Sequence, residues 1–260
     1  MKRKWKYLFL VLMAGAIISF AYQTYRYYAP SHLKPIYSTP INSDTLRIAY
    51  IGDSWAFIHK NHHCQIATIL EDTLCRPVKV YSYGICGLTS KEIYENLFDN
   101  SDLKHFMQKR CYKYCVISAG INDTYKKMSA SYYQHSICAV IQFLLSNNIR
   151  PIILEIPDYD INKAYKRQRT SRRMLRQISM FFNNTPLDCK QLYREALNEM
   201  IQKFGYTDKI SIIRYKTWNF NGVKDIKTMY VSDGMHLNEY GYSVLDSVIA
   251  KEILRVNNKE

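Results

Sequence analysis

The sequence predicts an α/β domain in which a parallel sheet carries helices on both faces, preceded by an N-terminal transmembrane or signal helix. Three observations predict this arrangement. From Leu46 onward, short apolar segments of strand length alternate with longer segments of helical periodicity. The chain begins with basic residues and an uncharged apolar run. Between these parts, residues 23–45 contain prolines and little periodicity, which is typical of a linker.

The first segment, residues 1–22, consists of the basic stub "MKRKWK" and the apolar run "YLFLVLMAGAIISFAY". The run approaches the ~20 residues that a membrane-spanning helix needs and is long for the core of a signal peptide. Trp5, Tyr22 and Tyr25 could anchor its ends at the membrane interfaces. We therefore favour a retained signal anchor. The alternative is a cleaved signal peptide, with Ser19 and Ala21 as the small residues before the cut.

The basic residues also give this segment an orientation. They precede the apolar run, so the positive-inside rule places the stub in the cytoplasm and the following domain outside it. We therefore expect a membrane-anchored protein whose domain lies in the periplasm or at the cell surface. A cleaved segment would instead give a secreted protein.

Residues 46–260 are expected to form one domain, because 47% hydrophobic and 22% charged residues are ordinary globular values. The expected strands are Leu46–Ile51, Val78–Ser82, Tyr114–Ser118, Pro151–Ile156 and Lys209–Arg214. The expected helices are His63–Thr73, Ser90–Phe98, Ala130–Asn147, Asp188–Phe204 and Asn238 to about Arg255. In parallel sheets of this kind, ligands bind at the carboxyl ends of the strands.

Polar or glycine-containing turns stand at the ends of these elements. They are Gly52-Asp53-Ser54 in "IGDSW", "GICGLTS" with Gly87, "AGIND" with Asn122, and "DGMH" with Asp233 and His236. A serine hydroxyl needs a base to act as a nucleophile, and His236 can supply one. Asp233, three residues earlier, can accept the Nδ1 hydrogen and turn Nε2 towards Ser54. The turns therefore predict a Ser–His–Asp site.

Acyl transfer also needs donors for the developing oxyanion. The backbone N–H groups of Ser54 and Gly87 and the side-chain amide of Asn122 can provide three. Gly87 suits this role because, without a Cβ, its N–H can approach a substrate closely. Each motif alone is weak, but their joint occurrence in this order, each at an element boundary, is far less expected by chance.

In these four blocks the sequence resembles the SGNH hydrolases, also called the GDSL esterase/lipase family, over about residues 46–255. The resemblance implies a three-layer α/β/α, flavodoxin-like domain. It also implies a triad of Ser54, Asp233 and His236, with Ser54, Gly87 and Asn122 around the oxyanion. Trp55 departs from the leucine that the family often has, so it either shapes the acyl pocket or packs under the first helix.

Two other aspartates stand close to the proposed site. We prefer Asp233 as the acid because the short D-x-x-H turn ties it to His236. Asp53 and Asp123 are expected to hold loops through hydrogen bonds to the backbone.

Other features are given less weight. The segment from Asp158 to Pro186 is a long insertion near the predicted site, expected to form a lid or a substrate-binding flap. Its basic part, "NKAYKRQRTSRRMLR", is interpreted as a solvated face, with contact to anionic polysaccharide or lipid headgroups as the sharper alternative. The aromatic rings expected near the site, which could stack on sugars, are Tyr81, Tyr83 and Tyr125.

No cofactor, metal or nucleic-acid site is predicted. His59, His63 and Cys64 have no acidic partner of the H-E-x-x-H type. The net charge of +14 comes with no nucleic-acid-binding module. The seven cysteines form no recognisable disulfide framework. "NDT" at Asn122 matches a glycosylation sequon, but a sugar there would block the proposed oxyanion donor.

The sequence therefore predicts a membrane-tethered serine esterase, acting on O-acetyl groups of an envelope polysaccharide first and on a lipid ester second. The partners expected are this acylated carbohydrate or lipid ester and the membrane, reached through the N-terminal helix. An O-acyltransferase would use the same triad, with a sugar hydroxyl in place of water. A non-catalytic glycan-binding module is a further alternative, which the complete set of site residues argues against.

Overall fold

The computed structural model describes residues 2–28, 44–62, 64–99, 102–218 and 223–258. The chain divides into two compact units, Met1–Lys34 and Pro35–Glu260, and the first contains helix α1 (Lys2–Tyr28). The 18-residue window Lys4–Ala21 has a mean hydropathy of 1.5 and no buried residue. A helix of this length extends about 27 Å, close to the thickness of a bilayer core. By length and composition, α1 could therefore cross a membrane.

The linker begins later than predicted. The helix α1 continues through residues 23–28, which were assigned to the linker. The greater part of the predicted linker, residues 29–43, lies outside the described residues.

The second unit is built on one five-stranded parallel sheet, in the order β2-β1-β3-β4-β5. Its central strands are buried on both faces, as the continuous apolar runs in the sequence require. In β1, Ile48 to Ile51 have no exposed surface. The strands are β1 (Leu46–Gly52), β2 (Val78–Gly84), β3 (Tyr114–Ser118), β4 (Arg150–Leu154) and β5 (Ser211–Ile213).

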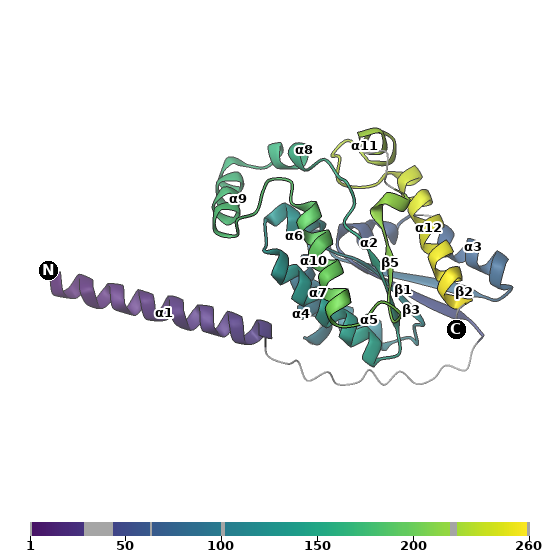
Figure 1. The fold of residues 1–260 in the computed structure, drawn as a ribbon, viewed down its shortest axis with the longest axis horizontal. Coiled ribbons are helices and arrows are strands. Elements are labelled where there is room, and N and C mark those ends of the chain that lie inside the picture. Colours follow the sequence, from purple (N-terminus) through teal and green to yellow (C-terminus); the bar gives the residue numbers. More distant parts are fainter. Residues whose placement is uncertain (1, 29–43, 63, 100–101, 219–222, 259–260) are drawn as a thin grey trace. The chain divides into compact units, whose positions relative to one another are not determined.

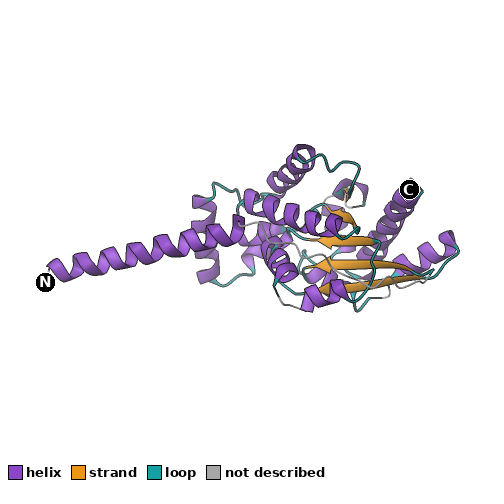
Figure 2. Ribbon diagram, turned by 90° about the horizontal axis from the view of Figure 1, so that it is seen from below, coloured by secondary structure: helices purple, strands orange, loops and turns teal. Residues whose placement is uncertain are grey.

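Helices cover both faces of this sheet (Figures 1 and 2). On one face α3 (Gln65–Leu74) packs against α12 (Glu239–Asn257). On the other, α7 (Ala130–Ser146) lies between α4 (Ser90–Phe98) and α10 (Lys190–Lys203), and α5 (Asp102–Gln108) packs beside α4. The three-layer α/β/α architecture predicted from the sequence is therefore confirmed.

Side-chain caps begin several of these helices where the sequence indicates. Thr89 and Glu92 form a capping box at the start of α4, with the Thr89 side chain accepting from the Glu92 N–H and Glu92 accepting from the Thr89 N–H. Ser129 and Asn238 cap α7 and α12 in the same manner.

Several short elements were not predicted, and most of them surround the carboxyl edge of the sheet. The insertion after β4, for which the sequence predicted a lid or a substrate-binding flap, contains two helices, α8 and α9. The unpredicted elements are α2 (Ser54–His59), α5, α6 (Ile121–Lys126), α8 (Ile161–Lys166), α9 (Thr170–Phe182), η1 (Tyr215–Thr217) and α11 (Val223–Met229). All seven cysteines lie in described parts of the chain, and no disulfide bond joins any two of them.

Candidate active site

The turn between β1 and α2 places Ser54 at the carboxyl edge of the sheet. Gly52 has a φ of +152°, and a Cβ on it would lie 2.0 Å from the Ser118 carbonyl oxygen of β3, so only glycine fits. Asp53 then caps α2, accepting a hydrogen bond from the Trp55 N–H at 3.0 Å. Ser54 is consequently the first residue of α2, with an N–H that needs no acceptor within the helix.

The predicted serine, histidine and aspartate lie within hydrogen-bonding distance in the expected order. His236 Nε2 lies 2.8 Å from Ser54 Oγ, and His236 Nδ1 lies 2.6 Å from Asp233 Oδ2. Asp233 Oδ1 accepts the backbone N–H groups of Met235 and His236 at 2.8 and 3.0 Å. The base therefore has one nitrogen held by the carboxylate and the other directed at the hydroxyl.

The hydrogen bonds to Asp233 also keep it ionised. Partial burial acts to raise its pKa, but the side-chain and backbone hydrogen bonds from His236 and the N–H of Met235 outweigh burial, so the pKa lies below its usual value. An ionised Asp233 can fix the tautomer of His236 and stabilise the imidazolium formed when His236 takes a proton.

The proposed oxyanion donors lie in two neighbouring loops. Gly87 has a φ of +83°, with open space where a Cβ would stand. Asn122, at the start of α6, donates through Nδ2 to the Leu88 carbonyl oxygen at 3.0 Å and lies 3.4 Å from Asp53 Oδ2. Asn122 thus joins the Gly87 loop to the nucleophile turn. To bind an oxyanion, its amide must release one of these acceptors.

For Trp55 the sequence left two alternatives, a place in the acyl pocket or packing under the first helix. The Trp55 side chain is 1% exposed, so it packs inside the domain. Its Nε1–H donates to the Met235 carbonyl oxygen at 3.1 Å, and the Tyr242 hydroxyl donates to the Trp55 carbonyl oxygen at 3.1 Å. Trp55 therefore connects the nucleophile helix to the loop that carries Asp233 and His236.

The two remaining aspartates hold loops, as predicted. Asp123 accepts hydrogen bonds from the N–H and hydroxyl of Ser90, at 2.9 and 2.6 Å. Asp53 caps α2 and lies beside Asn122. Burial raises the pKa of Asp53 to about 7 and that of Asp123 to about 6. Asn122 itself is 7% exposed, which leaves no room for a glycan on its sequon.

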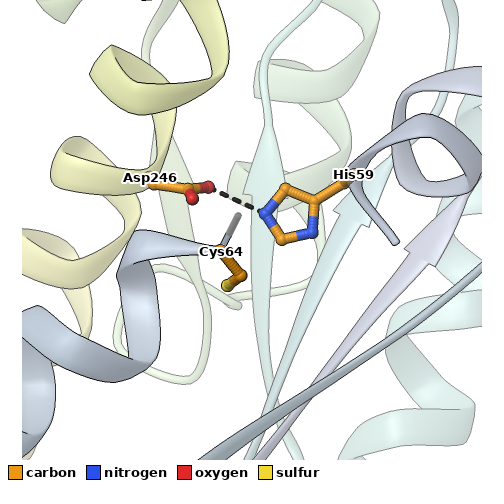
Figure 3. A group of neighbouring side chains, drawn as sticks. All are labelled: His59, Cys64 and Asp246. Carbon is orange, nitrogen blue, oxygen red and sulfur yellow. Dashed lines mark hydrogen bonds and ion pairs between the residues drawn. The ribbon is translucent and has the colours of Figure 1, made fainter. Parts of the chain in front are cut away.

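A second Ser–His–Asp set, which the sequence did not predict, consists of Ser82, His59 and Asp246. Figure 3 shows its contact between His59 and Asp246, which connects α2 to α12. His59 Nε2 lies 2.8 Å from Asp246 Oδ1, and His59 Nδ1 lies 2.9 Å from Ser82 Oγ. Asp246 is 2% exposed although it stands in the apolar stripe of α12, between Leu245 and Ile249. An acidic residue in such a stripe is the signal that could have indicated a buried basic partner.

This second set is an ion pair rather than a catalytic site. Burial opposes a charge on His59, but the contacts with Asp246 and Cys64 outweigh it and raise the pKa to about 9. At neutral pH the imidazolium is already protonated and cannot take a proton from Ser82. Ser82 lies within the strand β2.

The same group contains the residues considered above for a metal. Donor atoms of His59, Cys64 and Asp246 lie within 4.8 Å of one another, while His63 is outside the described residues. The acidic partner missing from the sequence motif therefore comes from α12. A metal ion would have to displace the proton shared by His59 and Asp246, so we assign the group as an ion pair.

The three tyrosines expected near the site have their ring faces in contact with other side chains. The Arg110 guanidinium lies 4.1 Å from the Tyr81 ring centroid, and that of Arg176 lies 3.7 Å from the Tyr125 centroid. Tyr83 packs against Phe106, with ring centroids 5.5 Å apart. These contacts describe half-buried aromatic residues better than sugar platforms.

A cavity of about 630 Å³ adjoins the loop that carries Asp233 and His236. Ser232 and Gly234, on either side of Asp233, form part of its wall, and Ser54 and His236 do not. Its charged wall residues are Asp158, Asp160, Lys163, Asp188, Lys190 and Lys227. The wall of the space next to the Ser–His–Asp site therefore combines charged side chains with apolar surface.

No protein-family model and no curated protein matches the chain. In contrast, the structure of the chain is similar to several solved structures. A lipase/acylhydrolase from Enterococcus faecalis is 17% identical, with a TM-score of 0.56 over 80% of this chain and 95% of that one. The esterase EstA from Pseudoalteromonas sp. is 13% identical, with a TM-score of 0.55 over 83% and 100%.

A GDSL-like lipase from Bacteroides thetaiotaomicron is 17% identical, with a TM-score of 0.52 over 82% of this chain and 89% of that chain. At these identities the likeness establishes the fold. The parallel sheet and its helix layers are therefore those of the SGNH (GDSL) hydrolases.

Proposed function

We propose that this protein is a serine esterase that hydrolyses ester bonds through an acyl-enzyme on Ser54. The observation that carries the proposal is the chain of contacts from Ser54 Oγ to His236 Nε2 at 2.8 Å and from His236 Nδ1 to Asp233 at 2.6 Å. These residue types at these distances form a nucleophile, a base and a group that orients the base. The fold shared with esterases and lipases supports the same activity.

The reaction follows from this geometry. Ser54 Oγ attacks the ester carbonyl carbon while His236 Nε2 takes the hydroxyl proton. The N–H groups of Ser54 and Gly87 and the Asn122 amide stabilise the oxyanion. When the tetrahedral intermediate collapses, the C–O bond to the alcohol breaks and the alcohol leaves with the proton from His236. Water then attacks the acyl-enzyme by the same steps, releasing the carboxylic acid and restoring Ser54.

The substrate that we propose is an O-acetylated polysaccharide of the cell envelope. The charged side chains in the wall of the adjoining cavity can bind sugar hydroxyl groups, which a long acyl chain does not offer. The apolar helix α1, preceded by basic residues, supports a membrane-anchored domain outside the cytoplasm. A lipid ester is the competing substrate, and the acyl-chain series described below separates the two.

The activity is tested with the full chain in mild detergent and p-nitrophenyl acetate. We expect Ser54→Ala to lower kcat by at least about 10³-fold, because the nucleophile is removed. The matched control is Ser82→Ala, which disturbs the other Ser–His–Asp set and should retain kcat within a few fold. Undiminished turnover by Ser54→Ala would contradict the mechanism.

The substrate class is tested by comparing p-nitrophenyl esters from acetate to palmitate and by measuring acetate released from an O-acetylated polysaccharide. Preference for acetate together with release of free acetate from the polymer supports the proposal. A preference for palmitate would identify a lipase, and transfer of acetyl groups to a second glycan without free acetate would identify a transferase.

A further inference from the structure

The helix α9 (Thr170–Phe182) presents a row of apolar side chains to solvent, while the Arg173 and Arg176 side chains on another face are half-buried. Surface helices of globular domains normally do the reverse, because the apolar stripe is the face that packs on the core. None of the residues of α9 is fully buried. Figure 1 shows α8 and α9 at the periphery of the domain, outside the layer formed by α6, α7 and α10.

The inward face of α9 is held by polar contacts. The Arg176 guanidinium stacks on the Tyr125 ring at 3.7 Å, and the Arg173 carbonyl oxygen accepts a hydrogen bond from the Tyr165 hydroxyl at 3.4 Å. Just beyond the helix, the Asn183 side chain donates to the Lys127 carbonyl oxygen at 2.9 Å. These contacts fix which face of α9 points away from the domain.

The outward face carries five large apolar side chains within about 120° of the helix circumference. A row of this kind on one short helix differs from the single exposed apolar residues found on most protein surfaces. Their exposed fractions are 60% for Met174, 64% for Leu175, 47% for Ile178, 81% for Phe181 and 79% for Phe182.

The segment that carries this apolar row is strongly basic. Residues 161–182, which comprise α8 and α9, contain no acidic residue. Five of their cations are exposed: Lys163, Lys166, Arg167, Arg169 and Arg172. Apolar side chains with lysine and arginine around them are typical of a helix that lies in the interface of a membrane, where the cations meet anionic headgroups.

We propose that α8 and α9 form a second membrane contact, in which the apolar row of α9 inserts into the surface of an anionic phospholipid bilayer. The charge of the segment and the apolar helix α1 favour a bilayer over a protein partner. The proposal is independent of the esterase activity.

The test is hydrogen exchange on the full chain in lipid nanodiscs that hold one copy each. One disc contains phosphatidylcholine alone, and the other also contains phosphatidylglycerol as an anionic lipid. We expect backbone amides of residues 174–182 to exchange at least about tenfold more slowly in the anionic disc. High salt should reduce this protection, because it screens the charge attraction.

Two variants make the result specific to the apolar row. The double variant Leu175→Ser and Phe181→Ser should lose the protection while keeping esterase activity, since both side chains are exposed. The control variant is Leu192→Ser, because Leu192 is an exposed apolar residue of α10. This variant should keep the protection of residues 174–182. Equal exchange in both discs, or protection that survives the double variant, would overturn the proposal. Protection that appears only when two copies share a disc would identify a second copy as the occupant and overturn it too.

Discussion

The ion pair between His59 and Asp246 should make the stability of the domain depend on pH. The pKa of His59 is about 9 in the folded chain, against 6.5 for an unperturbed histidine. A pKa raised on folding contributes stability that is complete below the unfolded value and is lost as the pH rises through the folded value. The pair should therefore stabilise the domain at pH 6.5 and below, and progressively less up to pH 9.

The size of the effect follows from the same two pKa values. A rise from 6.5 to about 9 corresponds to roughly 3 kcal/mol at low pH. About 2 kcal/mol of this is lost between pH 6.5 and 8.5. Burial raises the pKa of Asp53 to about 7 and that of Asp123 to about 6. Their ionisation also lowers the free energy of unfolding as the pH rises, but mostly below pH 6.5. They are common to the wild type and the variants below, so their effect cancels.

The perturbation is Asp246→Asn, which removes the charge and keeps the shape of the side chain. Urea unfolding of the full chain in mild detergent can be followed through the fluorescence of the buried Trp55 and Trp218. The variant should be less stable than the wild type at pH 6.5, and the difference should shrink by about 2 kcal/mol at pH 8.5. Asp208→Asn, an exposed aspartate, is the control. The reasoning would be refuted if the unfolding free energies of the wild type and of Asp246→Asn changed in parallel between pH 6.5 and 8.5.

Three further substitutions test the site. Asp233→Asn should lower kcat about 10³- to 10⁴-fold at neutral pH on p-nitrophenyl acetate, because the tautomer of the base is no longer fixed; a change below tenfold would argue against Asp233 as the acid. Trp55→Phe removes the hydrogen bond to Met235, so kcat should fall roughly tenfold and the unfolding free energy by about 1–2 kcal/mol. Unchanged kinetics would mean that Trp55 does not position the histidine loop. Gly52→Ala places a Cβ 2.0 Å from the Ser118 carbonyl oxygen. It should lower the free energy of unfolding by about 3 kcal/mol or more in the same urea assay. A urea midpoint equal to that of the wild type would show that β3 shifts to accommodate the methyl group.

The sequence located the candidate site because each of its blocks stands directly after a strand or before a helix. In a parallel sheet, the carboxyl ends of the strands share one edge, so local patterns are enough to bring Ser54, Asn122 and His236 together. The bounds predicted for α4 also match the structure, in which Thr89 and Glu92 form a capping box at its first turn.

What the sequence did not predict depends on contacts between distant residues or on very short elements. The helices α2 and α6 are six residues long, too short to show helical periodicity. Asp246 pairs with His59 across 187 positions, without any local signal to connect them. The role of Trp55 likewise depends on Met235, from a loop at the other end of the domain sequence. The outward apolar face of α9 cannot be inferred from its pattern, which predicts only that the helix has two faces.

The assignment of Ser54 as the nucleophile is the central claim, and labelling with a fluorophosphonate tests it most directly. Trypsin cleavage after Arg47 and Lys60 releases Ser54 in one peptide, while cleavage after Lys79 and Lys91 releases Ser82 in another. Mass spectrometry should find one adduct per chain, on the peptide of Ser54, and no adduct in Ser54→Ala. A wild-type chain that stays unlabelled, or one labelled on the peptide of Ser82, would contradict the assignment.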